Sequence, residues 1–195
     1  LGLQFRDPDE ETRYRRQRDI DIQREAEANT LTNAFRNGVS NIVSGKDTDL
    51  YTFVPESRYD RVVASLYQMP VDPVAETTSH RPADFWGRNL LDHLIGMLPD
   101  LLEEDGVAYL MQISILGQLR TLELLSSAGL QSRVLDFSFF HFSQTFMEHL
   151  PQIKKVEELS DAYHLSFGNT IVLVMYLLEV RLTKDAYPGY GDGVK

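Results

Sequence analysis

Three stretches rich in apolar residues constrain the fold of this chain most. They are RYDRVVASL (58–66), VAYLMQISI (107–115) and TIVLVMYLLEV (170–180). Strands with such continuous apolar runs are typical of parallel sheets, which are buried on both faces. Between them lie segments whose apolar residues recur at helical spacing. The sequence therefore predicts an α/β fold: a Rossmann-like, doubly wound, mostly parallel sheet with helices on both faces.

The remaining elements follow from the same patterns. Helices are expected over residues 22–38, 86–106, 116–129 and about 144–158, and a further strand over 132–142. Asn37-Gly38, Gly106 and Gly129 are read as helix stops. The chain then divides into a charged N-terminal segment (1–18), one α/β domain (19–183) and a flexible tail (184–195).

Charge and composition exclude several classes of function. The net charge of −10 argues against binding to nucleic acid, whose phosphates repel an acidic surface. The apolar run 170–180 is shorter than the roughly 20 residues of a membrane-spanning helix. The absence of cysteine excludes disulfides and a thiolate nucleophile, and it fits a cytoplasmic protein. We expect a small-molecule or peptide substrate, no membrane partner and no metal, and we leave a homo-oligomer open.

Acidic residues follow two of the expected strands. Asp19 and Asp21 stand immediately before the first predicted helix, and Asp47 and Asp49 follow a short apolar stretch. In nucleotide-binding α/β folds, an acid at the first of these positions accepts hydrogen bonds from ribose hydroxyls. The alternatives are a helix N-cap for the first pair and a solvated turn for the second.

The order of these motifs resembles class I S-adenosylmethionine-dependent methyltransferases, closest to the branch that methylates nitrogen and carries an Asn-Pro-Pro-Tyr loop. RNGV (36–39), YDRVV (59–63), MLPDLLEEDGVAYL (97–110) and LLSSAGL (124–130) are similar to successive segments of that family. The resemblance implies S-adenosylmethionine as cofactor, with methyl transfer to a nitrogen, less readily an oxygen. It implies that Asp19, with Asp21, binds the ribose and that Asp47 or Asp49 lies on the adenine side.

The loop after the strand 58–66 takes the place of the family's Asn-Pro-Pro-Tyr. It reads SLYQMP (65–70), so the resemblance assigns acceptor chemistry to Ser65, Tyr67 and Gln68 and substrate contacts to Met69 and Pro70. The Gln68 amide offers both a donor and an acceptor, as the family's asparagine does. The alternative is an ordinary proline-rich loop in which the glutamine is incidental.

Three further side chains are substrate-binding candidates. Trp86 could stack on a ring, Arg88 could bind a carboxylate, and His164 could act as a base. Each has a structural alternative: an anchor at a helix start for Trp86, and packing for a lone histidine. His141, inside an aromatic strand, could face a substrate or the core.

One departure from the family favours a different function. Residues 1–18 contain neither a buried strand nor a Gly-x-Gly turn, so we expect that the first strand is missing, with sequence upstream of Leu1 absent. The alternative to the enzyme is a non-catalytic, Rossmann-like interaction module whose strand VLDFSFFHF (134–142) serves an interface. A nicotinamide-dependent oxidoreductase shares the acidic ribose site but has less support.

Overall fold

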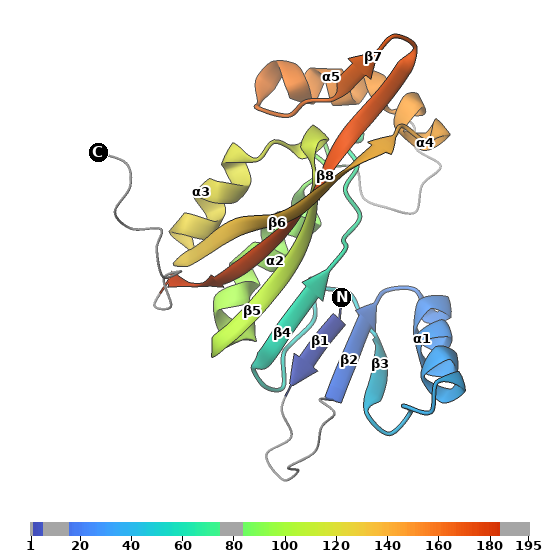
Figure 1. Cartoon of the computed structure of the whole chain (residues 1–195), viewed down its shortest axis with the longest axis vertical. Helices are drawn as coiled ribbons and strands as arrows, with labels where there is room; N and C mark the ends of the chain where they lie inside the picture. The colour runs from blue at the N-terminus through green and yellow to red at the C-terminus, as the bar shows by residue number, and fades with distance from the viewer. Residues whose placement is uncertain (1, 6–15, 75–83, 184–195) are drawn as a thin grey trace.

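The computed structural model describes residues 2–5, 16–74 and 84–183, with the backbone alone for residues 3–5 and 16. These residues form one eight-stranded sheet in the order β3-β2-β1-β4-β5-β8-β6, with β7 paired to β8 (Figure 1). The strands are β1 Gly2–Phe5, β2 Arg16–Asp21, β3 Val43–Asp47, β4 Tyr59–Ala64, β5 Leu102–Ile113, β6 Leu130–His141, β7 Leu165–Phe167 and β8 Thr170–Leu182.

Most of the strands point the same way. β2 is parallel to β3 and β4 is parallel to β5, while β8 is antiparallel to both of its neighbours β5 and β6. It follows that β2 to β6 share one direction and that only β1 and β8 oppose it along the path β3 to β6. The predicted fold class, a mostly parallel Rossmann-like sheet, is confirmed by this order.

The helices match the predicted segments with shorter bounds. They are α1 Arg24–Arg36, α2 Asn89–Leu101, α3 Leu119–Ser127, α4 Gln144–Glu148 and α5 Leu150–Leu159, with a 3-10 turn η1 at Ser114–Leu116. The helix predicted over 144–158 is thus two helices. The predicted stop at Gly106 differs from the structure, because α2 ends at Leu101 and β5 begins at Leu102. Gly106 lies where β5 passes close to β4: a Cβ there would stand 3.0 Å from the Tyr59 carbonyl oxygen.

Helices lie on both faces of the sheet, as predicted. Asp19 and Val63 share a face, because both are register partners of Gly2, and Asp19 bonds to Thr30 of α1. Val62 therefore points to the opposite face, where it is fully buried in the same core as the leucines of α2. On the α1 face Val63 is 46% exposed, so the helices cover the centre of this face incompletely.

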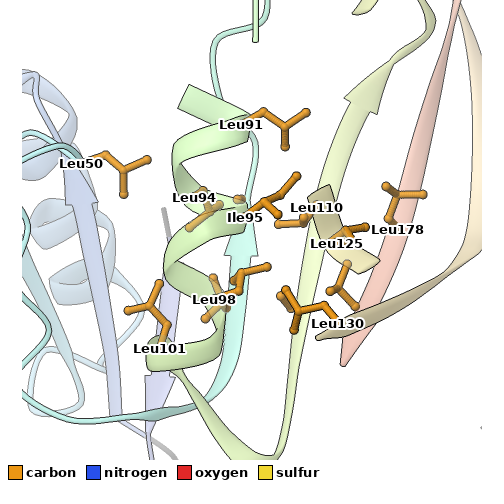
Figure 2. Packing of buried hydrophobic residues seen from close by; sticks show 14 of the residues in the cluster. Leu50, Leu91, Leu94, Ile95, Leu98, Leu101, Leu110, Leu125, Leu130 and Leu178 are labelled. Atoms are coloured by element: carbon orange, nitrogen blue, oxygen red, sulfur yellow. The ribbon is translucent and has the colours of Figure 1, made fainter. Parts of the chain in front are cut away.

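The core is built mainly by one face of α2. Leu91, Leu94, Ile95, Leu98 and Leu101 recur at helical spacing, and each is at most 1% exposed. They pack against Leu110, Leu125, Leu130 and Leu178 from β5, α3, β6 and β8 (Figure 2). This packing holds β4 and β5 rigidly, so the loops that leave their ends are positioned by the core.

A strand occupies the centre of the sheet where the sequence suggested none. Gly2–Phe5 lies between β2 and β4 and is antiparallel to both, with Gly2 opposite Asp19 and Val63. β2 starts at Arg16, within the last residues of the segment 1–18. A strand of four residues beside a charged run carries too little periodicity to be recognised from the sequence. Residues 6–15 and the predicted tail 184–195 lie outside the described residues.

Candidate functional site

The carboxyl ends of β2, β3 and β4 meet at one edge of the sheet, and two of them end in an aspartate. Asp21 is the last residue of β2 and Asp47 the last of β3, and the two are register partners. Neighbouring strands lie about 4.8 Å apart, so the two carboxylates start from adjacent backbone positions. The loop after β4, which begins at Ser65, leaves from the same edge.

Asp19 and Asp21 have different surroundings. An oxygen of Asp19 accepts a 2.5 Å hydrogen bond from the Thr30 hydroxyl, which ties α1 to the sheet. Asp21 Oδ1 accepts a 2.8 Å bond from the backbone amide of Gln23, the N-cap residue of α1. This bond forms an Asx turn ahead of the helix and not the N-cap given as the alternative, because Gln23 is the N-cap residue and its side chain makes no capping bond.

The second acidic pair lies in a turn at the same edge. Asp47 Oδ2 is 3.0 Å from Nε of Arg24, whose side chain is 88% exposed, so this ion pair is weak. Asp49 Oδ1 accepts a 3.0 Å bond from the amide of Tyr51, which gives the turn predicted as the alternative for this pair. Both carboxylates remain beside the end of β3.

Tyr51 is a site residue that the sequence reading missed. Its ring is 4.6 Å from the His93 ring of α2, and its side chain is 47% exposed. Partial burial raises the pKa of its phenol, and the nearby carboxylates of Asp84, Asp49 and Asp92 raise it further. Tyr51 could have been recognised from the sequence, because it is an aromatic residue two positions after Asp49 in a loop at the carboxyl end of a strand.

Gln68 has a different role from the predicted acceptor clasp. It is 8% exposed, its Nε2 donates to the Met111 carbonyl at 2.5 Å, and its Oε1 accepts from the Ile113 amide at 2.9 Å. The β4–β5 pairing ends at Ala64 and Leu110, so the Gln68 amide continues the ladder along β5. This side chain acts in place of a strand backbone, and we assign it to positioning the loop.

The rest of the loop divides into buried and exposed residues. Met69 is 4% exposed and belongs to the core, and Pro70 is also buried, so the structure does not present them to a substrate as predicted. Ser65 and Tyr67 are exposed, Tyr67 at 41%. Of the loop residues predicted to contact a substrate, Ser65 and Tyr67 are therefore the ones exposed on the surface.

A second loop, before α2, is locked against the first. The Val71 amide donates to the Asp84 carbonyl at 2.8 Å. Gly87 has φ of +69°, and a Cβ on it would lie 2.5 Å from the peptide between Met69 and Pro70. Trp86, one residue earlier, is 40% exposed and stacks edge-on against Phe85. The contact fixes both loops, which explains why the loop after β4 is rigid.

Arg88 does not have the predicted carboxylate-binding role. It is 4% exposed, and all five N–H donors of a guanidinium are in use here. They bond to Asp92, to Thr121 and to the carbonyls of Leu116 and Gly117. Arg88 thus joins the start of α2 to η1 and α3.

The histidine candidates lie elsewhere. His164 precedes β7, and its Nδ1 is 2.7 Å from Glu157 of α5. α5 and β7 lie at the opposite end of the molecule from α1 and β3 in Figure 1. His141 is the last residue of β6. The structure does not bring either histidine to the acidic ends of β2 and β3.

Among the described residues no group of histidine and acidic side chains has the arrangement of a metal site, and no helix could span a membrane. Away from the carboxyl edge, the hydroxyls of Tyr163 and Tyr176 form a hydrogen bond with each other. Burial raises the pKa of Tyr176 to about 12, and the bond to Tyr163 acts in the same direction.

No family model matches the sequence, and no curated protein matches it. Solved structures do. A ribosomal protein L11 methylase from Lactobacillus delbrueckii subsp. bulgaricus is 19% identical with a TM-score of 0.43, covering 81% of this chain and 55% of that one. A SAM-dependent methyltransferase from Geobacter sulfurreducens, in complex with S-adenosyl-L-homocysteine, is 10% identical with a TM-score of 0.44, covering 83% and 74%.

The [4+2]-cyclase SpnF is 12% identical with a TM-score of 0.46, covering 85% of this chain and 66% of that one. This chain thus spans just over half the length of the L11 methylase. Because these identities and TM-scores are low, the fold of this chain is assigned from its own strand order. The activities in these names belong to those proteins, and they already differ between a methylase and a cyclase.

Proposed function

We propose that this chain binds S-adenosylmethionine at the carboxyl edge of its sheet and transfers the methyl group to a nitrogen, less readily to an oxygen, of a small molecule or a peptide side chain. The observation that supports this best is the placement of Asp21 and Asp47 at adjacent strand ends, beside the loop after β4. Ligands of open α/β sheets bind outside the carboxyl ends of the strands.

The residues present fit the nucleoside half of this cofactor. Carboxylates only accept hydrogen bonds, and a ribose offers two hydroxyl donors. Asp21 is the better ribose ligand because it is the last residue of β2. Asp19 lies two residues earlier in the strand and accepts a hydrogen bond from Thr30 of α1. Asp47 or Asp49 takes the adenine side, where the exposed ring of Tyr51 offers a stacking surface.

The acceptor would lie over the two locked loops. When bound, the cofactor supplies an electrophilic methyl group on a sulfonium. Ser65 can hold an acceptor through its hydroxyl, and Tyr67 and Trp86 present half-exposed rings on neighbouring loops. Gln68 and Gly87 keep these loops in place, which contributes to catalysis through orientation.

One observation favours the second candidate function, a non-catalytic interaction module. In the family that the sequence resembles, a glycine-rich turn after the first strand holds the methionine half of the cofactor. Here β1 is antiparallel, so the chain leaves Phe5 at the opposite edge of the sheet. The described residues contain no glycine-rich turn at the carboxyl edge. They therefore offer no binding site for the methionine half of the cofactor.

Calorimetric titration with S-adenosylhomocysteine separates the two functions. The enzyme proposal predicts saturable binding that Asp21→Ala weakens about tenfold, which corresponds to about 1.4 kcal/mol, the value of one lost charge-assisted hydrogen bond. Asp105→Ala is the matched control, because Asp105 is an exposed acid in the first half of β5. Absence of binding by folded protein would leave the interaction module.

A further inference from the structure

Strand β6 forms an open edge of the sheet. It is the last strand in the order, and within the described residues β8 is its only strand partner over Leu130–His141. The outer edge of such a strand carries a row of backbone N–H and C=O groups able to pair with another strand. Natural edge strands are protected by charged residues, proline or bulges. In β6 the bulge and Arg133 lie before Asp136, Asp136 is the one acid, and no lysine or proline occurs between residues 130 and 141.

This edge is strongly apolar. Five large apolar side chains of β6 are between 41% and 58% exposed: Val134, Leu135, Phe137, Phe139 and Phe140. The polar residues among them are Asp136 and Ser138. Contiguous apolar patches of this kind on a folded protein usually mark an interaction site.

The exposed side chains lie on both faces of the sheet. Phe137 and Phe139 are register partners of Tyr176 and Val174, and their rings contact each other edge to face at 5.9 Å. Phe140 is the partner of Leu173 and points to the opposite face. A docked helix covers one face only, whereas a strand that extends the sheet brings side chains to both. The partner therefore pairs as a strand.

We propose that β6 pairs antiparallel with β6 of a second copy of this chain, about a two-fold axis at Ser138. This register starts beyond the bulge between Val134 and Asp136, where the ladder is regular. It places Phe137 of each copy opposite Phe139 of the other, and such aromatic cross-strand pairs stabilise a sheet. The proposal is independent of the proposed function.

Charge and area both permit a second copy. In this register each Asp136 lies opposite Phe140 of the other copy, so the two carboxylates are four positions apart, about 13 Å along the strand. A phenylalanine contributes ~200 Å² when buried, so three that are half exposed bring ~300 Å² per copy. With Val134, Leu135 and the strand backbones, the total approaches the ~1,200 Å² of a small specific interface.

The net charge of −10 on each copy opposes association at a distance. Salt screens this repulsion over about 10 Å at 0.1 M, so dimerisation should strengthen as salt is raised from 0.05 to 0.5 M. Sedimentation velocity on the full chain between 5 and 200 μM measures this directly. A chain that stays monomeric over this range would overturn the proposal.

Two variants test the surface. Phe139→Arg should weaken the dimer at least tenfold, because it replaces one member of both aromatic pairs. Phe35→Arg is the control, since Phe35 is 79% exposed on α1 and far from β6 in the fold. Equal weakening by both variants would contradict an interface at β6.

The register has its own test, because the chain contains no cysteine. On the two-fold axis the Cα atoms of the two Ser138 residues would be about 5 Å apart, within the range of a disulfide. S138C should therefore form a cross-linked dimer on mild oxidation, and D136C, about 13 Å from its mate, should not. Equal cross-linking of both, or of neither while the protein is dimeric, would overturn this register.

Discussion

Some side chains in this protein form hydrogen bonds that the backbone of a neighbouring strand or helix would form in regular structure. Gln68 is the clearest case, since its amide bonds to the carbonyl of Met111 and the amide of Ile113. A functional polar group at this loop was expected from the residues SLYQMP. Its role could not be predicted, because the partners lie 43 and 45 residues away in the chain. Arg88 is similar. An arginine near a helix start suggested a ligand contact, but Arg88 is buried, and its hydrogen bonds join α2 to α3.

Gln68→Ala should lower the free energy of unfolding by about 1–3 kcal/mol, because it removes a buried amide and leaves two part-buried backbone groups of β5 without that partner. Urea denaturation measures the change. Ser65→Ala, in the same loop and exposed, is the control and should change stability by less than about 0.5 kcal/mol. If Gln68→Ala were as stable as the wild type and lost only turnover, the acceptor clasp would be the better assignment.

The elements differ in how far local pattern determines them. Four leucines of α2, which recur at helical spacing, are fully buried, so this helix was predictable to within five residues at each end. β1 was not, because its four residues form a strand only between β2 and β4, which are supplied from elsewhere in the chain. In the candidate site, Asp21 and Asp47 could be named from the sequence because each is the last residue of a strand. Tyr51 was missed, because its importance depends on contact between its ring and His93 of α2, which is distant in the sequence.

The same substitution at two glycines should have opposite effects. Gly96 lies inside α2, is exposed, and has nothing within 4 Å of an added Cβ, so Gly96→Ala should stabilise the protein by about 0.5–1 kcal/mol. Gly87→Ala should destabilise it by about 2 kcal/mol or more, because its φ of +69° and the 2.5 Å approach to the Met69–Pro70 peptide leave no room. Thermal unfolding of both variants checks the pair. A gain in stability at Gly87 would contradict the packed loops.

At the scale of the whole molecule, the sheet order brings the residues of the proposed site together at one edge. β2, β3 and β4 share a direction, so their last residues and the loops that follow converge. Packing of α2 against β4 and β5 positions the loop after β4, and the bond from Thr30 of α1 to Asp19 positions α1 against β2. β6, at the opposite side of the sheet, is left for contact with another molecule.

The central claim is that a nucleoside-containing cofactor binds at the ends of β2, β3 and β4. Hydrogen exchange of backbone amides, with and without saturating S-adenosylhomocysteine, locates that site without assuming turnover. The account predicts slower exchange confined to residues 21–25, 47–52 and 65–67, including the amides of Gln23, Thr48 and Tyr51. Unchanged exchange throughout, or protection only around α4, α5 and β7, would contradict it.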